Sequence, residues 1–342
     1  MTTDRGSVES RSPASALAEA VAAAVSAPSV HNTQPWRWRL HPTALDLYAE
    51  RSRQLPAADP QGRLLVMSCG AALHHVRTAL AAEGWLASVS RFPDPADPDH
   101  LARVTVTDRS GVMAEAMRLF QTIGMRRTDR RPLVDEPLPP SALDAVRRAA
   151  AAEGTDLHRV TEEQLSDLAV AAAHANEIGL ADPDQRAELA YWVGGQRAEG
   201  TGVPDPVLPS SVPQTDVPER DFGHAGTLRV GAGHDRAATY ALLFGRGDEP
   251  SDWLRAGEAL SACWLTATEL GVSVLPLSSV VEVPATRQAL RRILSGLGYP
   301  YIVLRLGAAD PDEPGPPHTP RLSLAEILDV SEVRPGGQGG SG

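Results

Sequence analysis

The chain has 342 residues, of which 42% are apolar and 22% charged, and its formal net charge is −11. This composition is typical of a globular protein, and the acidic balance argues against a nucleic-acid partner, which would need clustered basic residues. The sequence contains no lysine, so all 32 basic residues are arginine. Pyridoxal-phosphate enzymes, Walker A ATPases and protein kinases all need a lysine and are therefore excluded.

Cysteine content and hydropathy bear on the compartment. Cys69 and Cys263 each fall in an apolar helical stripe, so we expect two buried, reduced thiols. No segment reads as a membrane span, and the polar N-terminus is unlike a signal peptide. We expect a cytoplasmic protein with no membrane partner. No residues have metal-ligand spacing, so no metal site is expected.

Hydrophobic periodicity and turn residues predict alternating helices and strands in chain order. The predicted elements of the first part are a helix at 14–26, a hairpin at 36–40 and 45–49, a helix at 64–82, a strand at 101–107 and a helix at 113–125. A helix-rich region then runs from 140 to 198. The last part predicts a strand at 239–245, a helix at 253–270, a strand at 272–275, a helix at 284–297 and a strand at 301–306.

Three segments lack this periodicity. Residues 1–12 and 331–342 are expected to be disordered tails. Residues 200–225 are dense in proline and glycine, and a loop of this length is either disordered or functional, often as an active-site lid.

A weak internal repeat predicts two related halves. Gly70 is followed fourteen positions later by Gly84, and Gly257 is followed fourteen positions later by Gly271. Each pair brackets part of an amphipathic helix that a valine- or isoleucine-containing strand follows. The repeat favours an internal duplication with pseudo-twofold symmetry. We place the first half at 13–110 and the second at 111–330, with a lid-like insertion at 181–225.

Three motifs carry candidate functional residues. In the segment 27–36, Asn32 and Gln34 can each donate and accept hydrogen bonds, which suits the edge of a heterocycle such as a flavin pyrimidine. The same residues would also fit an ordinary capped turn. In Arg126-Arg127-Thr128-Asp129-Arg130-Arg131, four arginines at a helix end fit either a bound phosphate or a solvated basic patch. In the segment 270–279, a helix end, a short strand and a proline–serine turn could offer small groups beside a planar ring, or be a plain connection.

In this order the three motifs resemble those of the FMN-dependent nitroreductase family, and most of all its Acg-like branch of duplicated single-chain proteins. The resemblance covers about residues 14–330, and the Pro-Ser-x-x-Asn-x-Gln-Pro-Trp string at 28–36 is its most specific part. It implies an α+β, nitroreductase-like fold, an internally duplicated pseudo-dimer with a central antiparallel sheet in each half flanked by helices. It also implies FMN as cofactor, NAD(P)H as a candidate electron donor, and hydride transfer through flavin N5 to or from a conjugated small molecule.

The resemblance assigns roles to individual residues. Those expected to hold the phosphate and ribityl chain are Arg126, Thr128 and Arg130, with Arg127 contributing and Arg321 closing on the phosphate. Those expected to contact the isoalloxazine are Pro28, Ser29, Val30 and Asn32. Those expected to line the flavin near N5 are Pro276, Leu277 and Ser278. No side-chain acid or base is required for catalysis, because the substrate would stack on the ring.

The chain also departs from the family. The first half has no arginine string of its own, so we expect one FMN per chain, in a monomeric pseudo-dimer or a homodimer. Ser278-Ser279 replaces the glutamate–glycine that often follows the flavin-side proline. Two alternatives to a nitroreductase-like enzyme therefore stay open. One is a non-catalytic protein that stores or sequesters FMN, and the other is a natural-product tailoring dehydrogenase.

Overall fold

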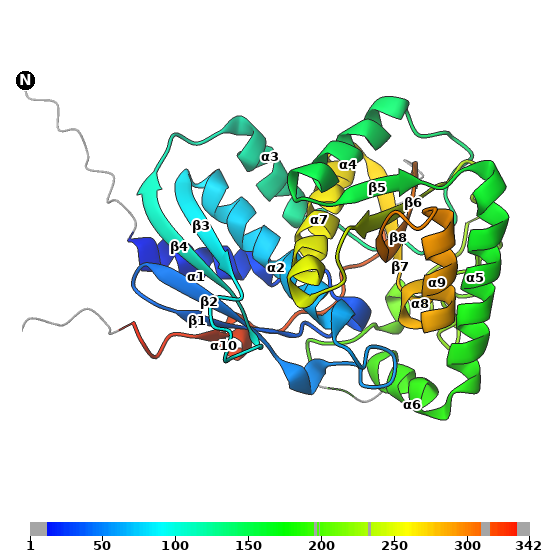
Figure 1. Cartoon of the computed structure of the whole chain (residues 1–342), viewed down its shortest axis with the longest axis horizontal. Coiled ribbons are helices and arrows are strands. Elements are labelled where there is room, and N and C mark those ends of the chain that lie inside the picture. Colours follow the sequence, from blue (N-terminus) through cyan, green and yellow to red (C-terminus); the bar gives the residue numbers. More distant parts are fainter. Residues whose placement is uncertain (1–11, 195–196, 198, 232–233, 309–314, 334–342) are drawn as a thin grey trace, which may run out of the picture.

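The computed structural model describes residues 12–194, 197, 199–231, 234–308 and 315–333, which form two halves side by side (Figure 1). The predicted tail at 1–12 lies outside the described residues except for Ser12, whose side chain caps the first helix. Both halves combine a mainly antiparallel sheet with flanking helices. The predicted α+β class is therefore confirmed.

The first half holds a five-stranded sheet in the order β3-β4-β2-β1-β9, in which β9 (Leu328–Asp329) comes from the end of the chain. Its elements are α1 (Pro13–Ala24), η1 (Val30–Asn32), β1 (Trp36–Leu40), β2 (Ala44–Ala49), η2 (Arg51–Arg53), α2 (Arg63–Ala82), β3 (Trp85–Arg91), β4 (His100–Arg109) and α3 (Ala114–Ile123). The predicted hairpin is β1 and β2, which pair antiparallel from Trp36 to Leu40. The indoles of Trp36 and Trp38 are fully buried on one face of β1, as the alternation with arginine predicted.

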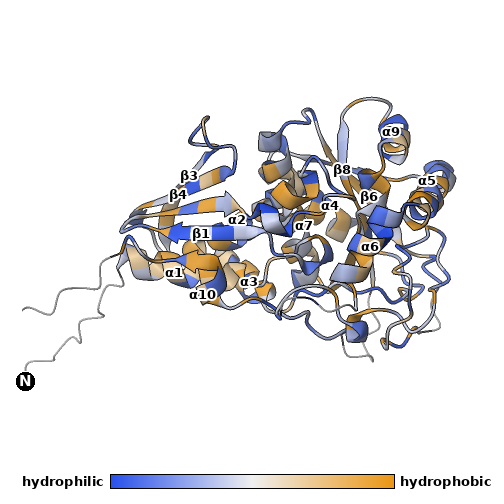
Figure 2. Cartoon of the chain, turned by 90° about the horizontal axis from the view of Figure 1, so that it is seen from below, coloured by the Kyte–Doolittle hydropathy of each residue, from blue (hydrophilic) through white to orange (hydrophobic). Residues whose placement is uncertain are grey.

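The second half holds a four-stranded antiparallel sheet in the order β5-β6-β8-β7. Its elements are α4 (Pro140–Ala152), β5 (Asp156–Arg159), α5 (Glu162–Ala181), α6 (Pro183–Trp192), η3 (Asp205–Val207), β6 (Thr239–Gly245), α7 (Pro250–Glu269), β7 (Val272–Leu277), α8 (Ser279–Glu282), α9 (Pro284–Ile293) and β8 (Tyr299–Ala308). In Figure 2, α5 carries hydrophobic and hydrophilic residues on different sides. Its buried residues Leu168, Ala172 and Ala175 pack into the core of this half.

The two halves repeat one arrangement. The strand order β3-β4-β2-β1 in the first half matches β7-β8-β6-β5 in the second, and all these neighbours are antiparallel. In each half a long helix, α2 or α7, is followed by the sheet-edge strand β3 or β7. The residue directly before each of these strands is a glycine, Gly84 or Gly271, in the left-handed region at φ 77° or 71°, as helix-ending glycines often are. This correspondence agrees with the predicted duplication, which stays a prediction.

The helices α2 and α7 pack against each other where the two halves meet (Figure 1). They touch at the first glycines of the repeat, because a Cβ atom on Gly70 would lie 3.0 Å from the Cα atom of Gly257. By length and composition α2 alone among the described helices could cross a membrane, but 89% of the apolar stretch is buried within the protein. It is the core helix of the first half. Cys69 and Cys263, on α2 and α7, are both free and buried, as expected.

The end of the chain returns to the first half. After α10 (Leu324–Ile327), β9 (Leu328–Asp329) pairs in parallel with β1, so it adds to the first sheet although the predicted second half runs to 330. The predicted tail at 331–342 also needs correction at its start. Val333 packs against the core of the first half, and Glu332 Oε2 lies 2.8 Å from His41 Nδ1. Residues 334–342 lie outside the described part.

Candidate functional site

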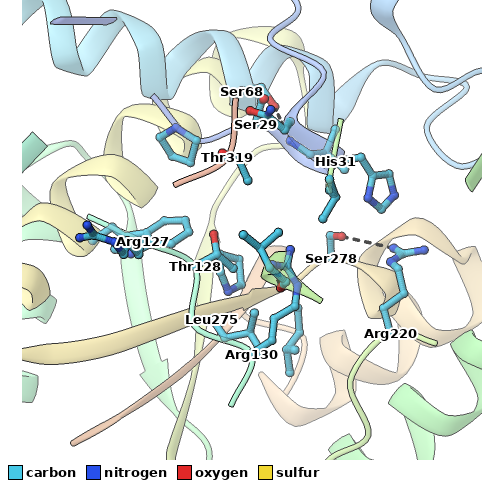
Figure 3. Close-up of a pocket in the computed structure, with 18 of the residues that line it drawn as sticks. Ser29, His31, Ser68, Arg127, Thr128, Arg130, Arg220, Leu275, Ser278 and Thr319 are labelled. Carbon is cyan, nitrogen blue, oxygen red and sulfur yellow. Dashed lines mark hydrogen bonds between the residues drawn. The ribbon is translucent and has the colours of Figure 1, made fainter. Parts of the chain in front are cut away.

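One cavity lies between the halves, and every residue predicted to bind a cofactor lines it. These residues are Pro28, Ser29, Val30, Asn32, Arg126, Arg127, Thr128, Arg130, Pro276, Leu277, Ser278 and Arg321. They come from four segments far apart in the sequence, and Figure 3 shows several of them around the same space. The structure therefore brings the three motifs together, as the resemblance implied.

The first wall is the segment 28–34, whose backbone is strained. His31, Asn32 and Gln34 have φ angles of 46°, 55° and 51°, in the left-handed region that non-glycine residues rarely occupy. Each such residue costs about 1–3 kcal/mol and persists only where its surroundings fix it. The Ser29 hydroxyl helps to hold this conformation, because it accepts a hydrogen bond from the backbone N–H of Gln34 at 3.0 Å.

Two side chains in this wall hold other segments. The Asn32 amide group donates to the carbonyls of Gly202 and Pro320, at 3.0 and 2.8 Å, and its oxygen accepts from Arg321. The Gln34 amide group donates to the Gly200 carbonyl at 2.8 Å, and its oxygen accepts from the Leu322 amide. Both donors of Asn32 are used within the protein, so its side chain does not offer the donor–acceptor edge that we predicted for a heterocycle.

Three arginines, Arg126, Arg127 and Arg321, lie together at the cavity. Arg126 and Arg321 both donate to the carbonyl of Ser26, at 3.1 and 3.4 Å, while Arg127 donates to the Met125 carbonyl. Within the described residues no carboxylate lies within 4.0 Å of these guanidinium groups, and the Nε atoms of Arg126 and Arg127 are buried without a partner. We call Arg126, Arg127 and Arg321 the arginine cluster.

The environment of the arginine cluster makes its charge costly. Burial, and then the nearby Arg321, lowers the pKa of Arg126 to about 9, and burial lowers that of Arg321 to about 10. The Arg126 guanidinium also stacks on the Trp264 ring of α7, 4.4 Å from its centroid. Buried cations without anions are unfavourable. A bound anion would relieve this cost.

The remaining arginines of the string have other partners. Arg131 turns away and pairs with Asp129 at 2.7 Å. The buried Arg305 of β8 donates to the carbonyls of Asp129 and Arg131, at 3.0 and 2.8 Å, and so fixes the loop that carries the string. Arg130 lies apart from the arginine cluster, because it donates to the Val207 carbonyl and stacks 5.4 Å from the Phe222 ring centroid.

Residues 200–222 cover the cavity and contribute side chains that the sequence did not single out. Glu219 and Arg220 both make ion pairs with residues of the second half, Glu219 with Arg305 of β8 at 2.5 Å and Arg220 with Glu282 of α8. Arg220 also donates to the Ser278 hydroxyl at 3.3 Å (Figure 3). Burial raises the pKa of Glu219 to about 7 although Arg305 opposes this shift. In the sequence, the only indication of their role was that Glu219 and Arg220 are adjacent charged residues inside a proline-rich segment.

Residues 200–222 are anchored by a small hydrophobic core of their own. Val203, Val207 and Leu208 are buried with Leu55, Ala58, Trp192 and Val193. The sequence left open whether 200–225 is a disordered or a functional loop. In the structure this segment packs over the cavity. We call residues 200–222 the covering segment.

The third wall comes from β7 and the long helices. We predicted a strand ending at 275, but β7 continues through Pro276 and Leu277, which pair with Leu304 and Val303 of β8. A proline is tolerated here because β7 is an edge strand. Ser68 of α2 also lines the cavity and accepts a hydrogen bond from the Val30 amide at 3.3 Å. Ser68 was not among the residues that the sequence singled out.

The fold and the cavity define a two-part α+β protein with an arginine-lined cavity between its halves. No family model matches the sequence. The chain is 39% identical over 316 residues to "Putative NAD(P)H nitroreductase Rv3131" of Mycobacterium tuberculosis (strain ATCC 25618 / H37Rv), covering 90% of each chain. It is 33% identical over 317 residues to "Putative NAD(P)H nitroreductase acg" of the same strain, covering 92% of this chain and 95% of that protein.

Among solved structures, the chain resembles an FMN and NADPH-dependent nitroreductase, NfnB, from "sphigopyxis sp. strain HMH". That match has 18% identity and a TM-score of 0.40, and it covers 62% of this chain and 97% of the other. The two mycobacterial relatives decide the assignment, because identity and coverage are both high. The chain belongs to the nitroreductase family of oxidoreductases, in the group that includes Acg, as its motifs had indicated.

Proposed function

We propose that this chain is an FMN-dependent oxidoreductase that binds one FMN in the cavity between its halves. The observation that carries the proposal is the arginine cluster, three guanidinium groups at one end of the cavity with no carboxylate partner among the described residues. Arginine forks bind phosphate oxygens in pairs, and a phosphate would supply the missing negative charge.

The residues present fit the rest of the cofactor as well. Thr128 lies beside the arginine cluster and adds a hydroxyl for the phosphate or ribityl chain. Beyond it, Val30, Pro276 and Leu277 are available to pack on a planar ring. Arg130, on the side of the covering segment, would act on the ring portion rather than on the phosphate. Bound FMN would supply hydride transfer through its N5 atom, to or from a conjugated small molecule.

The chain's own part in such a reaction is to bind, orient and exclude water. The strained segment 28–34 and β7 approach the cavity from different halves, so they can hold a ring between them. The covering segment limits the entry of solvent and of large molecules. Because one chain supplies all these walls, we propose that the working unit is a monomer, with both cysteines reduced in the cytoplasm.

NAD(P)H is the proposed electron donor, since both mycobacterial relatives carry it in their names. A second candidate function, FMN storage without turnover, is favoured by the two ion pairs that hold the covering segment over the cavity. One experiment separates them. Purified protein loaded with FMN is titrated anaerobically with NADPH and NADH, and then with dithionite. The flavin absorbance near 450 nm is recorded over a period on the order of minutes after each addition.

Bleaching by a nicotinamide supports the oxidoreductase with that donor. Bleaching by dithionite alone supports the storage protein, or an enzyme that takes electrons from its own substrate, as a tailoring dehydrogenase would. If the protein binds no FMN under any loading condition, the proposal is wrong.

A further inference from the structure

Two carboxylates share one guanidinium nitrogen beside the cavity. Nη1 of Arg305 donates to Glu219 Oε1 at 2.5 Å and to Asp235 Oδ2 at 2.7 Å. The other terminal nitrogen of Arg305 donates to the backbone carbonyls of Asp129 and Arg131. The two acids are thus held close together with one cation between them. Like charges in such a position favour a proton on one member of the pair.

The hydrogen bonds of the two acids decide which one carries the proton. Asp235 is fully buried, and both of its oxygens accept, one from Arg305 and the other from the backbone N–H of Leu133 at 2.6 Å. Neither oxygen is free to hold a proton. Glu219 lines the cavity, and within the described part of the chain no donor bonds to its second oxygen. The proton of the pair therefore belongs on Glu219.

The charged groups around Glu219 agree with this placement. Burial raises the pKa of Glu219 to about 7, although Arg305 and Arg130 oppose the shift. The nearby carboxylates Asp235 and Asp129 reinforce it. A carboxyl group in this range is poised to give up a proton at neutral pH, as a general acid must. The nearby hydroxyl of β6, in residue 240, stays neutral because burial raises the pKa of this tyrosine.

We propose that Glu219 is a catalytic acid, which protonates the conjugated molecule that accepts a hydride in the cavity. The inference rests on the proposed function, because bound FMN must supply the hydride. An acceptor that takes a hydrogen with its electron pair needs one further proton to complete the two-electron reduction. The O–H bond of Glu219 breaks, the proton forms a new bond to an oxygen or nitrogen of the acceptor, and a carboxylate remains. Solvent returns the proton afterwards.

Arg305 suits the second part of this step. Its Nη1 already lies 2.5 Å from Glu219 Oε1, so the negative charge that the departing proton leaves behind is stabilised without movement of either side chain. Glu219 belongs to the covering segment, which therefore contributes an acid as well as an enclosure. The sequence had indicated no acid at this site.

Two substitutions separate the acid from a purely structural ion pair. In Glu219→Gln the amide oxygen can still accept from Arg305, but the side chain has no acidic proton to give. The matched control is Asp221→Asn, which removes an exposed carboxyl of the same segment that does not line the cofactor cavity and accepts from the backbone N–H of Gly223.

The first test needs no cofactor. Infrared spectra of the FMN-free protein are recorded between about pH 5 and pH 9, and the spectra of Glu219→Gln are subtracted from those of the wild type. The subtraction is needed because burial also raises the pKa of Asp59 to about 7. We expect the carbonyl band of a protonated carboxyl, lost with a midpoint at about pH 7 and kept in Asp221→Asn. If the subtraction leaves no such band, Glu219 is ionised throughout and the proposal is wrong.

The second test follows the proton in the reaction. FMN-loaded protein is reduced anaerobically with one equivalent of dithionite and mixed in a stopped-flow instrument with nitrofurazone or with ferricyanide. The nitro group takes a hydride and a proton to give a nitroso group and water, whereas ferricyanide takes single electrons and no proton. We expect Glu219→Gln to slow reoxidation by nitrofurazone on the order of a hundredfold at about pH 6, with ferricyanide within about twofold. The wild-type rate with nitrofurazone should fall as the pH rises through about 7, and the rate of the variant should not.

The outcomes separate the two proposals. Identical pH profiles in wild type and Glu219→Gln, or equal slowing with both oxidants, would overturn the role of Glu219. Wild-type protein that never loads FMN refutes the proposed function instead. If Glu219→Gln does not fold, Asp235→Asn decides, because removing the second carboxylate should move the fall of the nitrofurazone rate to lower pH. An unchanged midpoint in Asp235→Asn contradicts the proposal.

Discussion

Gly70 and Gly257 face each other where α2 crosses α7, and neither position has room for a side chain. A Cβ atom on Gly257 would lie 1.9 Å from the carbonyl oxygen of Met67 and 2.9 Å from the Cα atom of Gly70. Gly257→Ala should therefore push the two helices apart and lower the free energy of unfolding by about 1–3 kcal/mol, as overpacking does.

The matched control for this change is Gly179→Ala in α5, where the new methyl group would meet only the end of the Gln185 side chain at 3.4 Å. Alanine is the better helix former, so this variant should be as stable as the wild type or slightly more stable. Urea denaturation of both variants measures the difference. If both variants unfold at the same urea midpoint, the crossing of α2 and α7 has room for a methyl group and the prediction is wrong.

The arginine cluster should recognise the phosphate of FMN and nothing else of the cofactor. Arg126→Ala combined with Arg321→Ala should weaken FMN binding at least a hundredfold, because charge-assisted bonds to a dianion are lost. Riboflavin, which lacks the phosphate, should bind both proteins with similar affinity. Quenching of flavin fluorescence measures the affinities of the wild type and the double variant for FMN and for riboflavin. The control is Arg37→Ala, which removes an arginine whose side chain is 60% exposed. Equal losses for FMN and riboflavin would place the cluster elsewhere on the cofactor.

The ion pair of Arg220 with Glu282 should hold the covering segment down. Glu282 is 3% exposed and does not line the cofactor cavity, so Glu282→Gln alters the pair without touching the ligand. Removing one member of a buried pair is costly, and we expect FMN to dissociate about fivefold faster or more. Stopped-flow capture of released FMN by excess apoflavodoxin measures the rate. Glu50→Gln, in a pair with the exposed Arg37 away from the cavity, should leave the rate unchanged.

Asp59 should make the protein less stable as the pH rises. Burial raises the pKa of this 2% exposed carboxyl to about 7, although the Leu65 amide donates to it at 2.9 Å. An unfolded aspartate has a pKa of about 3.9. Between about pH 4 and pH 7 the folded state keeps a proton that the unfolded state has released, so stability falls through this window and stays low above it.

Asp59→Asn should remove this dependence, because the amide oxygen can still accept from Leu65 and carries no charge. Relative to the wild type, the variant should gain about 2 kcal/mol of stability on going from pH 5 to pH 8. Denaturation at the two pH values, with the exposed Asp144→Asn as control, provides the measurement. A constant difference between variant and wild type would mean that Asp59 is ionised throughout.

The sequence predicted most of the helices and strands, and its failures have physical causes. β3 and β5 were missed because neither has an apolar face that alternates cleanly, and β3 exposes Leu86 while burying Trp85. β9 was missed because a strand of two residues has no period. Its pairing with β1 depends on a contact that no local pattern encodes.

The candidate site was predicted better than the contacts within it. Its residues could be named because each motif concentrates unusual residues, such as the arginines of 126–131. The separation of Arg130 from Arg126 could not be foreseen, because it depends on Phe222 and Val207 of the covering segment. The clamping role of Asn32 was hidden for the same reason, since its partners Gly202 and Pro320 lie 170 and 288 positions away.

The clamp made by Asn32 also dictates when in folding the site can exist. Its two hydrogen bonds form only when the covering segment and the stretch around Pro320 have reached the first half, so we expect the cavity to be completed late in folding. A partly folded chain has the arginines but no enclosure for a ring. Uptake of flavin should thus mark the end of folding, and the fraction of yellow protein in a preparation would count the molecules that have finished.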